Sequence, residues 1–261
     1  MLNLQFAADY LRHRFTSKTR HGVHSPFVYK LVDEIIYDFR AKEVYNSVEQ
    51  LRVNLLKDER FITITDLGAG SHMNNNKKKQ VKTLAKNALK PARLAQLIYR
   101  LAQYFNPANA VELGTCLGIT TSYLSKAIPQ GQITSIEGCA QTAGVAAENL
   151  KSLGIQNVDI KVGNFDEVLP RVINSDNDLD FVFIDGNHRK EATLNYFNWC
   201  LPKLSKNSVM IFDDIYWSKG MKEAWQEIKD NPRVTLTIDM FWIGLVFIRK
   251  EQVKEHFKIR F

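Results

Sequence analysis

Acidic side chains follow two apolar runs in the second half of the sequence, where they would face a bound ligand. Asp185 ends the run LDFVFIDG, and the adjacent Asp213 and Asp214 end the run SVMIFDDI. If these runs are neighbouring parallel strands, their carboxyl ends meet at one edge of a sheet and the carboxylates lie side by side. Like charges so close are costly unless a cation joins them, and oxygen ligands suit Mg²⁺. The pattern predicts a site for Mg²⁺ or a similar divalent cation, with an aspartate pair that caps the next helix as the alternative.

A glycine-rich turn follows an earlier apolar run, in VELGTCLGIT at residues 111–120. Gly114 and Gly118 indicate that the backbone comes close to a ligand there. The turn lacks the G-x-G-x-x-G spacing of dinucleotide-binding proteins, and it contains an acid, Glu112. A carboxylate repels a pyrophosphate but can hold a cationic amino group. The predicted ligand therefore carries an amino group instead of a pyrophosphate.

Three further polar residues extend this predicted site. Glu137 ends the next run, QITSIEG, where an acid accepts hydrogen bonds from a ribose diol. The hydroxyls of Thr115 and Thr120, with the amides at the start of the following helix, could bind a carboxylate. A nucleoside joined to an amino acid satisfies all of these groups, and S-adenosylmethionine (SAM) is such a cofactor.

Seven β-rich runs must position these residues from about residue 108 onward. Helical stretches separate the first five runs, a rhythm typical of a parallel sheet covered on both faces. The last two runs are separated only by MFWI and are expected to form an antiparallel pair. The predicted fold is α/β, a Rossmann-like, seven-stranded, mostly parallel sheet with helices on both faces and an antiparallel last strand. The runs are NAVELG, QITSIEG, VDIKVG, LDFVFIDG, SVMIFDDI, VTLTID and GLVFIRK.

The part before this alternation is expected to be a mainly helical amino-terminal segment. Its clearest predicted helices are SPFVYKLVDEIIYD and KPARLAQLIYRLAQYF. Between them, the polar and basic GSHMNNNKKKQVK is interpreted as a loop. The glycine-rich TDLGAG just before it lacks a following strand-helix-strand unit, so it is not expected to bind the main ligand.

The opening stretch MLNLQFAADYLRHRF indicates an amphipathic helix. Its apolar side chains are expected to pack on the same domain or on a partner subunit, so a homodimer is one arrangement that it would serve. Charges interrupt the stretch too early for a signal peptide or a membrane span. The side chains available for burial are Leu4, Phe6, Leu11 and Phe15.

Composition limits the remaining classes of protein. The 261 residues include 35 basic and 28 acidic side chains, for a net charge of +7. This moderate excess is more typical of lysines spread over a solvated surface than of a nucleic-acid-binding face. Cys116, Cys139 and Cys200 are far apart and odd in number, which argues against a disulfide framework and a zinc cluster and predicts a cytoplasmic setting.

Five motifs in order resemble the class I SAM-dependent methyltransferases. VELGTCLGIT is followed by ITSIEG, VGNFDEVLP, FVFIDGNH and VMIFDD. The pattern is most similar to the small-molecule O-methyltransferases of the catechol and caffeoyl-CoA type. The resemblance implies a methyltransferase domain at residues 91–261, and it leaves residues 1–90 as a helical cap for substrate binding or dimerisation.

The resemblance also implies roles for individual residues in the cofactor site. One group surrounds the methionine end, Glu137 binds the ribose, and Asn164 and Phe165 flank the adenine. The full set of implied cofactor-binding residues is Glu112, Gly114, Thr115, Gly118, Thr120, Glu137, Gly163, Asn164, Phe165 and Asp185.

The catalytic residues expected from the resemblance are His188 and Asp185. In catechol-type enzymes a lysine at the offset of His188 is the base, and an imidazole is suited to the same task. The alternatives are that His188 hydrogen-bonds the cofactor or caps the helix starting near Lys190. The family binds its metal through two aspartates and an asparagine, so Asp214 is a departure from its pattern.

The expected function is a SAM-dependent O-methyltransferase for a hydroxylated small molecule, assisted by a divalent cation. No N/D-P-P-Y/F run follows the fourth strand, which argues against methylation of a nucleobase amine. Tyr216 and Trp217 could stack on a ring of the acceptor or be buried against a neighbouring helix. The alternative functions are a metal-independent methyltransferase for RNA or a glycan, and a non-catalytic module that keeps the cofactor fold.

Overall fold

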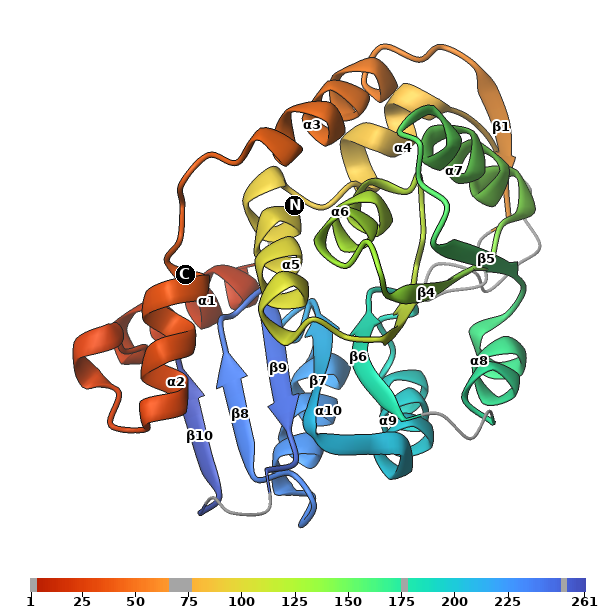
Figure 1. Cartoon of the computed structure of the whole chain (residues 1–261). Helices are drawn as coiled ribbons and strands as arrows, with labels where there is room; N and C mark the ends of the chain where they lie inside the picture. Colours follow the sequence, from red (N-terminus) through yellow and green to blue (C-terminus); the bar gives the residue numbers. More distant parts are fainter. Residues whose placement is uncertain (1–3, 66–76, 175–177, 250–252) are drawn as a thin grey trace. The chain divides into compact units, whose positions relative to one another are not determined.

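The computed structural model describes residues 4–65, 77–174, 178–249 and 253–261 (Figure 1). The chain divides into two compact units, residues 40–176 and residues 1–39 with 177–261. The functional boundary between residues 90 and 91 stays a prediction. Of the TDLGAG turn only Thr65 falls within the described residues, and the GSHMNNN part of the expected loop lies outside them.

The unit of residues 40–176 contains three parallel strands in the order β3-β4-β5. Apolar side chains such as Val111, Leu113 and Ile136 are buried, as in a sheet covered on both faces. The helices α6 and α7 connect these strands. The elements of this unit are α3 (Glu43–Leu55), β1 (Phe61–Ile64), β2 (Lys77–Gln80), α4 (Val81–Ala88), α5 (Ala92–Phe105), β3 (Asn109–Leu113), α6 (Ile119–Ala127), β4 (Gln132–Glu137), α7 (Ala140–Ser152), β5 (Val158–Val162) and α8 (Phe165–Ile173).

A short antiparallel pair, β1 with β2, corrects the prediction of a loop at its KKKQ end. Lys77 to Gln80 pair with Ile64 to Phe61. The three lysines of β2 stay exposed, so backbone pairing holds the strand although its side chains have no hydrophobic pattern. The polar, basic composition of KKKQ therefore led to a wrong prediction of a loop.

The second unit contains five strands in the order β10-β8-β9-β7-β6 (Figure 1). Strand β9 runs antiparallel to both β7 and β8, which confirms the reversed strand that the sequence predicts. The elements are α1 (Leu4–Thr16), the 3₁₀ turn η1 (Arg20–Gly22), α2 (Pro26–Lys30), the π-helical η2 (Leu31–Ile36), β6 (Leu179–Ile184), α9 (Lys190–Cys200), the 3₁₀ turn η3 (Leu201–Lys203), β7 (Leu204–Asp213), α10 (Lys219–Asp230), β8 (Leu236–Asp239), β9 (Ile243–Phe247) and β10 (Glu255–Lys258).

Strand β10 was not among the seven predicted runs. It pairs in parallel with β8, with Glu255 opposite Leu236 and Lys258 opposite Asp239. Its sequence, EHFK, has one apolar residue and two charged ones. A short polar strand at a sheet edge leaves little signal in a sequence, because its pairing depends on a partner strand far away in the chain.

Helix α1 packs on its own unit through Phe6, one of the four residues expected to be buried, together with Tyr10 and His13. Phe6 and Tyr10 lie edge-on to Phe241, with ring centroids 5.1 Å apart in both pairs. The Nε2 atom of His13 lies 3.0 Å from Oδ1 of Asp239, and both side chains are buried. Of the four apolar residues expected to be buried, three are exposed: Leu4, Leu11 and Phe15.

Asp239, the last residue of β8, joins α1 to this strand through several hydrogen bonds. Burial alone raises the pKa of its carboxyl, but the hydrogen bond and charge of His13, with further donors, hold the pKa below its ordinary value. One of those donors is the hydroxyl of Tyr216, 2.8 Å from Oδ2. Tyr216 also stacks on Phe241, so it is packed inside its unit, whereas Trp217 is exposed.

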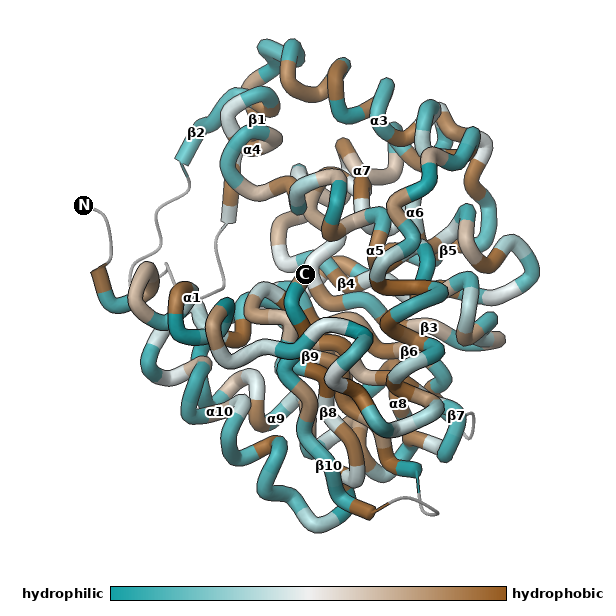
Figure 2. Tube along the Cα trace, turned by 90° about the vertical axis from the view of Figure 1, so that its left-hand side faces the viewer, coloured by the Kyte–Doolittle hydropathy of each residue, from teal (hydrophilic) through white to brown (hydrophobic). Residues whose placement is uncertain are grey.

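Helices α9 and α10 lie next to each other in this unit (Figure 1). Trp225 of α10 lies so close to strand β9 that a Cβ atom at Gly244 would be 2.5 Å from its Cη2 atom. Glycine is needed at this position for that approach. In Figure 2 the strands β8 and β9 are mainly hydrophobic, whereas most residues of α10 are hydrophilic.

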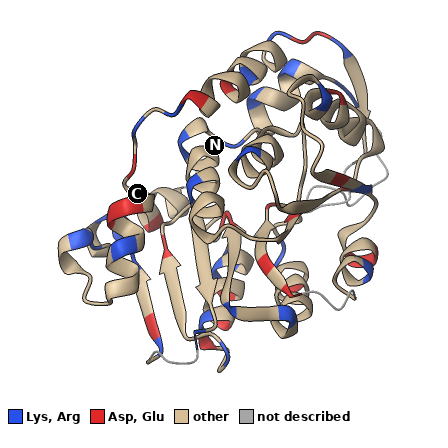
Figure 3. Cartoon of the chain, viewed as in Figure 1, with Lys and Arg blue, Asp and Glu red and all other residues tan. Residues whose placement is uncertain are grey.

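These elements confirm the α/β, Rossmann-like fold with mostly parallel strands and a mainly helical amino-terminal segment. Lys and Arg residues are distributed over several helices and loops, as expected for a solvated surface (Figure 3). Among the described residues, no helix has both the length and the apolar character needed to cross a membrane.

Candidate functional site

The turn after β3 has the backbone conformation for which glycine is required. Gly114 and Gly118 have φ values of 99° and 81°, and Cys116 between them has a φ of 51°. Gly118 is the N-cap of α6. A side chain at either glycine would strain the turn, so the two glycines predicted to approach a ligand also determine how α6 begins.

Glu137, the last residue of β4, connects this turn to the next one. Its Oε2 accepts a hydrogen bond from the amide of Cys116 at 2.8 Å, and its Oε1 accepts one from the amide of Cys139 at 2.9 Å. The side chain is only partly buried. A carboxylate has about four lone-pair sites, so Glu137 keeps acceptor capacity beyond the hydrogen bonds that it accepts from backbone amides. These acceptor oxygens fit the two hydroxyl donors of a ribose diol.

Glu137 also gives a prediction about pH. Burial raises the pKa of its carboxyl, although hydrogen bonds from the amides of Cys139 and Cys116 partly offset the rise. Glu137 therefore takes up a proton at a higher pH than an ordinary glutamate, and the protonated group accepts ribose hydrogen bonds poorly. Affinity for S-adenosylhomocysteine (SAH) is expected to fall about tenfold as the pH drops through this raised pKa.

Calorimetry with SAH over a series of pH values measures this effect. Glu137→Gln removes the titrating group, so its affinity should be lower at neutral pH and nearly constant below it. Glu148→Gln, at an exposed glutamate of α7, should follow the wild-type curve. A wild-type affinity that does not change with pH would contradict the ribose role.

Glu112 is fully buried under the turn. Its Oε2 accepts hydrogen bonds from the hydroxyls of Thr121 and Ser135, both at 2.6 Å. Ser135 lies directly opposite Glu112 in the parallel pairing of β3 with β4, and its hydroxyl also lies 2.6 Å from that of Thr115. The carboxylate thus fixes the turn from below. The predicted bond from Glu112 to an amino group stays a prediction.

The two threonines of the predicted site are both buried. Thr115 is 2% exposed and uses its hydroxyl in the contact with Ser135. Thr120 lies in the first turn of α6 and is 8% exposed. Binding of a carboxylate by these hydroxyls is not tested by the structure and stays a prediction.

The third predicted segment, Gly163 to Phe165, joins β5 to α8. Gly163 has a φ of 152°, and its amide donates to the carbonyl of Glu137 at 2.9 Å. The side-chain oxygen of Asn164 accepts from the amide of Asp166 and so caps α8. Phe165 is the first residue of that helix. The contact of Asn164 and Phe165 with adenine stays a prediction.

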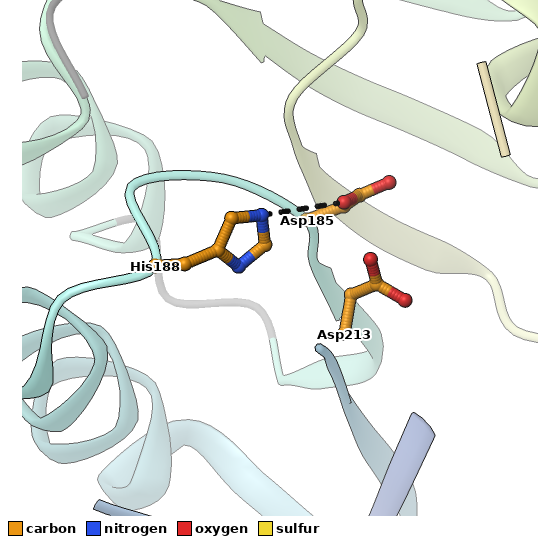
Figure 4. A group of neighbouring side chains, drawn as sticks. All are labelled: Asp185, His188 and Asp213. Carbon is orange, nitrogen blue, oxygen red and sulfur yellow. Dashed lines mark ion pairs between the residues drawn. The ribbon is translucent and has the colours of Figure 1, made fainter. Parts of the chain in front are cut away.

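The second unit brings Asp185, His188 and Asp213 together (Figure 4). Asp185 follows β6, His188 lies in the loop before α9, and Asp213 ends β7. One ligand atom from each of the three lies within 4.8 Å of the others. Strands β6 and β7 pair in parallel, which is why the two aspartates meet at one sheet edge. Asp185 and Asp213 thus lie side by side, as the sequence predicts.

Asp214 lies beside this group. Its Oδ2 is 3.9 Å from Nε2 of His188, which itself is 4.0 Å from Oδ1 of Asp185. Asp214 has a φ of 53°, and its amide donates to the carbonyl of Trp242. The group that can hold a cation includes His188, whereas the predicted third ligand was Asp214.

Two alternative roles for these residues are wrong. Ser218 is the N-cap of α10, and its side chain accepts from the amide of Met221 at 3.1 Å, so the aspartate pair does not cap that helix. Helix α9 has Arg189 at its N-cap and no side-chain cap hydrogen bond, so His188 does not cap α9. Helix capping therefore does not explain why these acidic residues and His188 lie together.

The donor set of this group fits a divalent cation. Two carboxylates suit Mg²⁺ or Mn²⁺, and an imidazole ligand favours a transition metal. His188 therefore has two competing roles, as a ligand or as a base, because a nitrogen bound to a metal cannot take up a proton. Sequence reasoning assigned only the second role.

Sequence reasoning also missed the hydroxyls that hold Glu112. Ser135 and Glu137 are two residues apart on β4 and so point to the same face. A buried carboxylate on one parallel strand needs a polar neighbour on the next strand, and that rule would have singled out Ser135. Thr121, one residue after Thr120 in α6, gave no comparable signal.

Residues 111–215 match the family model of a methyltransferase domain. This segment contains the glycine turn, Glu137 and the Asp185 group. The resemblance to methyltransferases is therefore confirmed for this part of the chain.

Among curated proteins the chain is similar to a catechol O-methyltransferase of Niastella koreensis, with 32% identity over 117 residues. These residues are 44% of this chain and 52% of the relative. The chain spans about half the length of the curated relatives it matches.

Two solved structures have the same fold. An O-methyltransferase from Streptomyces achromogenes in complex with SAM has a TM-score of 0.58 at 17% identity, covering 85% of this chain and 94% of that one. An O-methyltransferase from Bacillus cereus in complex with SAH has a TM-score of 0.57 at 18% identity, covering 83% of this chain and 96% of that one. At these identities the likeness shows the fold alone.

Proposed function

We propose that this chain is a SAM-dependent O-methyltransferase that acts on a hydroxylated small molecule with the help of a divalent cation. The observation that carries the proposal is the Glu137 carboxylate, which lies in the matched methyltransferase segment and joins the turns after β3 and β4. Relatives whose names include O-methyltransferase support an oxygen atom as the methyl acceptor.

The proposed cofactor site uses the residues of the unit 40–176. SAM, when bound, supplies a methyl group on a positively charged sulfur. Glu137 accepts hydrogen bonds from the two ribose hydroxyls, and Gly114 and Gly118 allow the backbone to approach the amino-acid portion. Glu112 supports the turn through its two hydroxyl donors, and the cofactor's amino group is its proposed further partner.

The proposed acceptor side uses the residues that follow β6 and β7. Asp185 and Asp213 would hold the cation, with Asp214 or His188 beside them. A cation there would supply Lewis acidity to an acceptor hydroxyl. His188 would take the proton of the acceptor hydroxyl as the methyl group passes from the sulfur of the cofactor to that oxygen.

The function is tested with SAM labelled in its methyl group and with catechol as the first acceptor, because one relative is a catechol O-methyltransferase. The expected result is equal amounts of SAH and of an O-methylated product. Label on nitrogen or sulfur across a panel of mixed acceptors would contradict the oxygen specificity. A chain that does not bind SAH at all would contradict the enzyme assignment.

His188→Ala is expected to lower kcat about 10²-fold while SAH affinity stays within about twofold, because a base acts on the acceptor and not on the cofactor. Steady-state kinetics at saturating SAM, with calorimetry for SAH, measure the two quantities. His21→Ala, at an exposed histidine of the same unit, is the matched control and should keep full activity.

Binding of Mn²⁺ separates the two roles of His188. If His188 is the base, His188→Ala keeps the wild-type Mn²⁺ affinity. If the affinity falls at least tenfold, His188 is a ligand and the base lies elsewhere.

The rival function, a methyltransferase for RNA or a glycan, predicts different behaviour. Binding of RNA would depend steeply on salt because phosphate contacts release counterions. The spread of Lys and Arg over several elements favours the small-molecule acceptor (Figure 3). A non-catalytic module would bind SAH without transferring the label.

Two further properties are part of the proposal. A cytoplasmic setting is supported by three cysteines that form no disulfide in the described structure. A homodimer is supported by exposed apolar residues on α1, which such an interface would cover. These residues are Leu4, Leu11 and Phe15.

A further inference from the structure

A cavity of about 320 Å³ lies in the unit of residues 1–39 and 177–261, apart from the residues used in the proposed function. Helices α1 and α10, the segment after β7 and the end of β10 line it. Four cationic side chains and one carboxylate, Asp9, face it. The cationic ones are Arg12, Lys222, Lys229 and Lys258.

The single carboxylate does not neutralise this group. Asp9 is bound to Lys222 in an ion pair. The nearby Asp239 already accepts hydrogen bonds from His13 and Tyr216. Within the described ranges, no carboxylate forms an ion pair with Arg12, Lys229 or Lys258. Three positive charges therefore share the cavity without a matching anion.

The surroundings of Lys229 disfavour the charged form of its side chain. Burial lowers the pKa of its ammonium group below the ordinary value. The charge of Asp239 opposes this fall in pKa, the charge of Lys258 adds to it, and Asp230 opposes it more weakly. Cations held together in a partly buried site are stabilised when an anion binds between them.

Trp225 adds a neutral donor to the same cavity. It is 3% exposed, and its Nε1 has no hydrogen-bond partner among the described residues. The six-membered ring lies against Gly244 of β9, and the side chain is one of those that line the cavity. A buried indole N–H without an acceptor is costly, and an oxyanion would supply the acceptor.

We propose that this cavity binds a phosphate group, as free phosphate or as a phosphate monoester, through Arg12, Lys229, Lys258 and the indole N–H of Trp225. A phosphate dianion has enough oxygens to accept from all four side chains, and its charge offsets the unpaired cations. The site takes no part in the proposed methyl transfer, so either proposal can fail without the other.

The test is calorimetry of the full chain with inorganic phosphate and with glycerol phosphate. Saturable one-to-one binding is expected, and Lys229→Met and Lys258→Met should each weaken it at least tenfold. Lys219→Met, at the exposed first residue of α10, removes the same charge away from the cavity and should leave the affinity unchanged.

Further results decide between this proposal and general attraction to a basic protein. Equal weakening by Lys219→Met, or equal binding of acetate, would overturn it. Trp225→Phe should also weaken binding if it folds, and the lysine variants carry the test if it does not. Tighter binding of glycerol phosphate than of phosphate identifies a monoester as the ligand, and the reverse order identifies free phosphate.

Discussion

Asp213→Asn is expected to reduce methyl transfer about 10³-fold while SAH binding stays within about twofold. Asp213 is 5% exposed at the end of β7, and its carboxylate is one of the two that meet at this edge of the sheet. An amide removes a negative charge from the proposed cation site without changing its shape. Loss of the cation removes several kcal/mol of stabilisation from the transition state. A loss of this size corresponds to the expected decrease of about 10³-fold in the rate.

Chelation provides an independent form of the same prediction. EDTA should abolish turnover of the wild type, and added Mg²⁺ or Mn²⁺ should restore it, but neither should restore Asp213→Asn. Asp230→Asn, at an exposed aspartate at the end of α10, is the matched control and should behave as the wild type. Full turnover after exhaustive chelation would show that Asp185 and Asp213 are structural.

Glu137→Ala is expected to weaken SAH binding about 10²-fold. The variant removes both proposed ribose acceptors, and each hydrogen bond to a charged group is worth roughly 1.5 kcal/mol or more. It also frees the amides of Cys116 and Cys139, so the turn after β3 loses a support. Calorimetry with SAH measures the affinity.

Thermal unfolding separates ribose binding from damage to the turn in this variant. Glu137→Gln keeps an acceptor oxygen for one amide, so it should retain more stability than the alanine variant and still bind SAH weakly. Wild-type affinity for SAH in either variant would show that Glu137 does not bind the ribose.

Much of the fold could be predicted because its signals are local. The runs that became β3 to β9 are apolar and bounded by turn residues, and Gly114 and Gly118 indicated the turn that their positive φ values require. Strands β1, β2 and β10 could not be predicted. β2 (KKKQ) and β10 (EHFK) are rich in charged residues, and β1 (FITI) is only four residues long, so each is a strand because a partner backbone offers hydrogen bonds.

The orientation of side chains was harder to predict than the elements themselves. Periodicity placed Phe6, Leu11 and Phe15 on a buried face of α1, and the structure bears this out for Phe6. Tyr10 and His13 make the other contacts because the aromatic Phe241 and the carboxylate of Asp239 lie opposite them. The same limit applies to the burial of Glu112, since the hydroxyls that hold it come from another strand and another helix.

A crystal structure of the chain grown with SAH and Mn²⁺ tests the cofactor site and the cation site together. Both ribose hydroxyls should lie within hydrogen-bond distance of the Glu137 carboxylate. An anomalous peak for Mn²⁺ should also lie on Asp185 and Asp213. Ribose bound away from Glu137, or no Mn²⁺ at these aspartates at full SAH occupancy, would contradict the proposed sites.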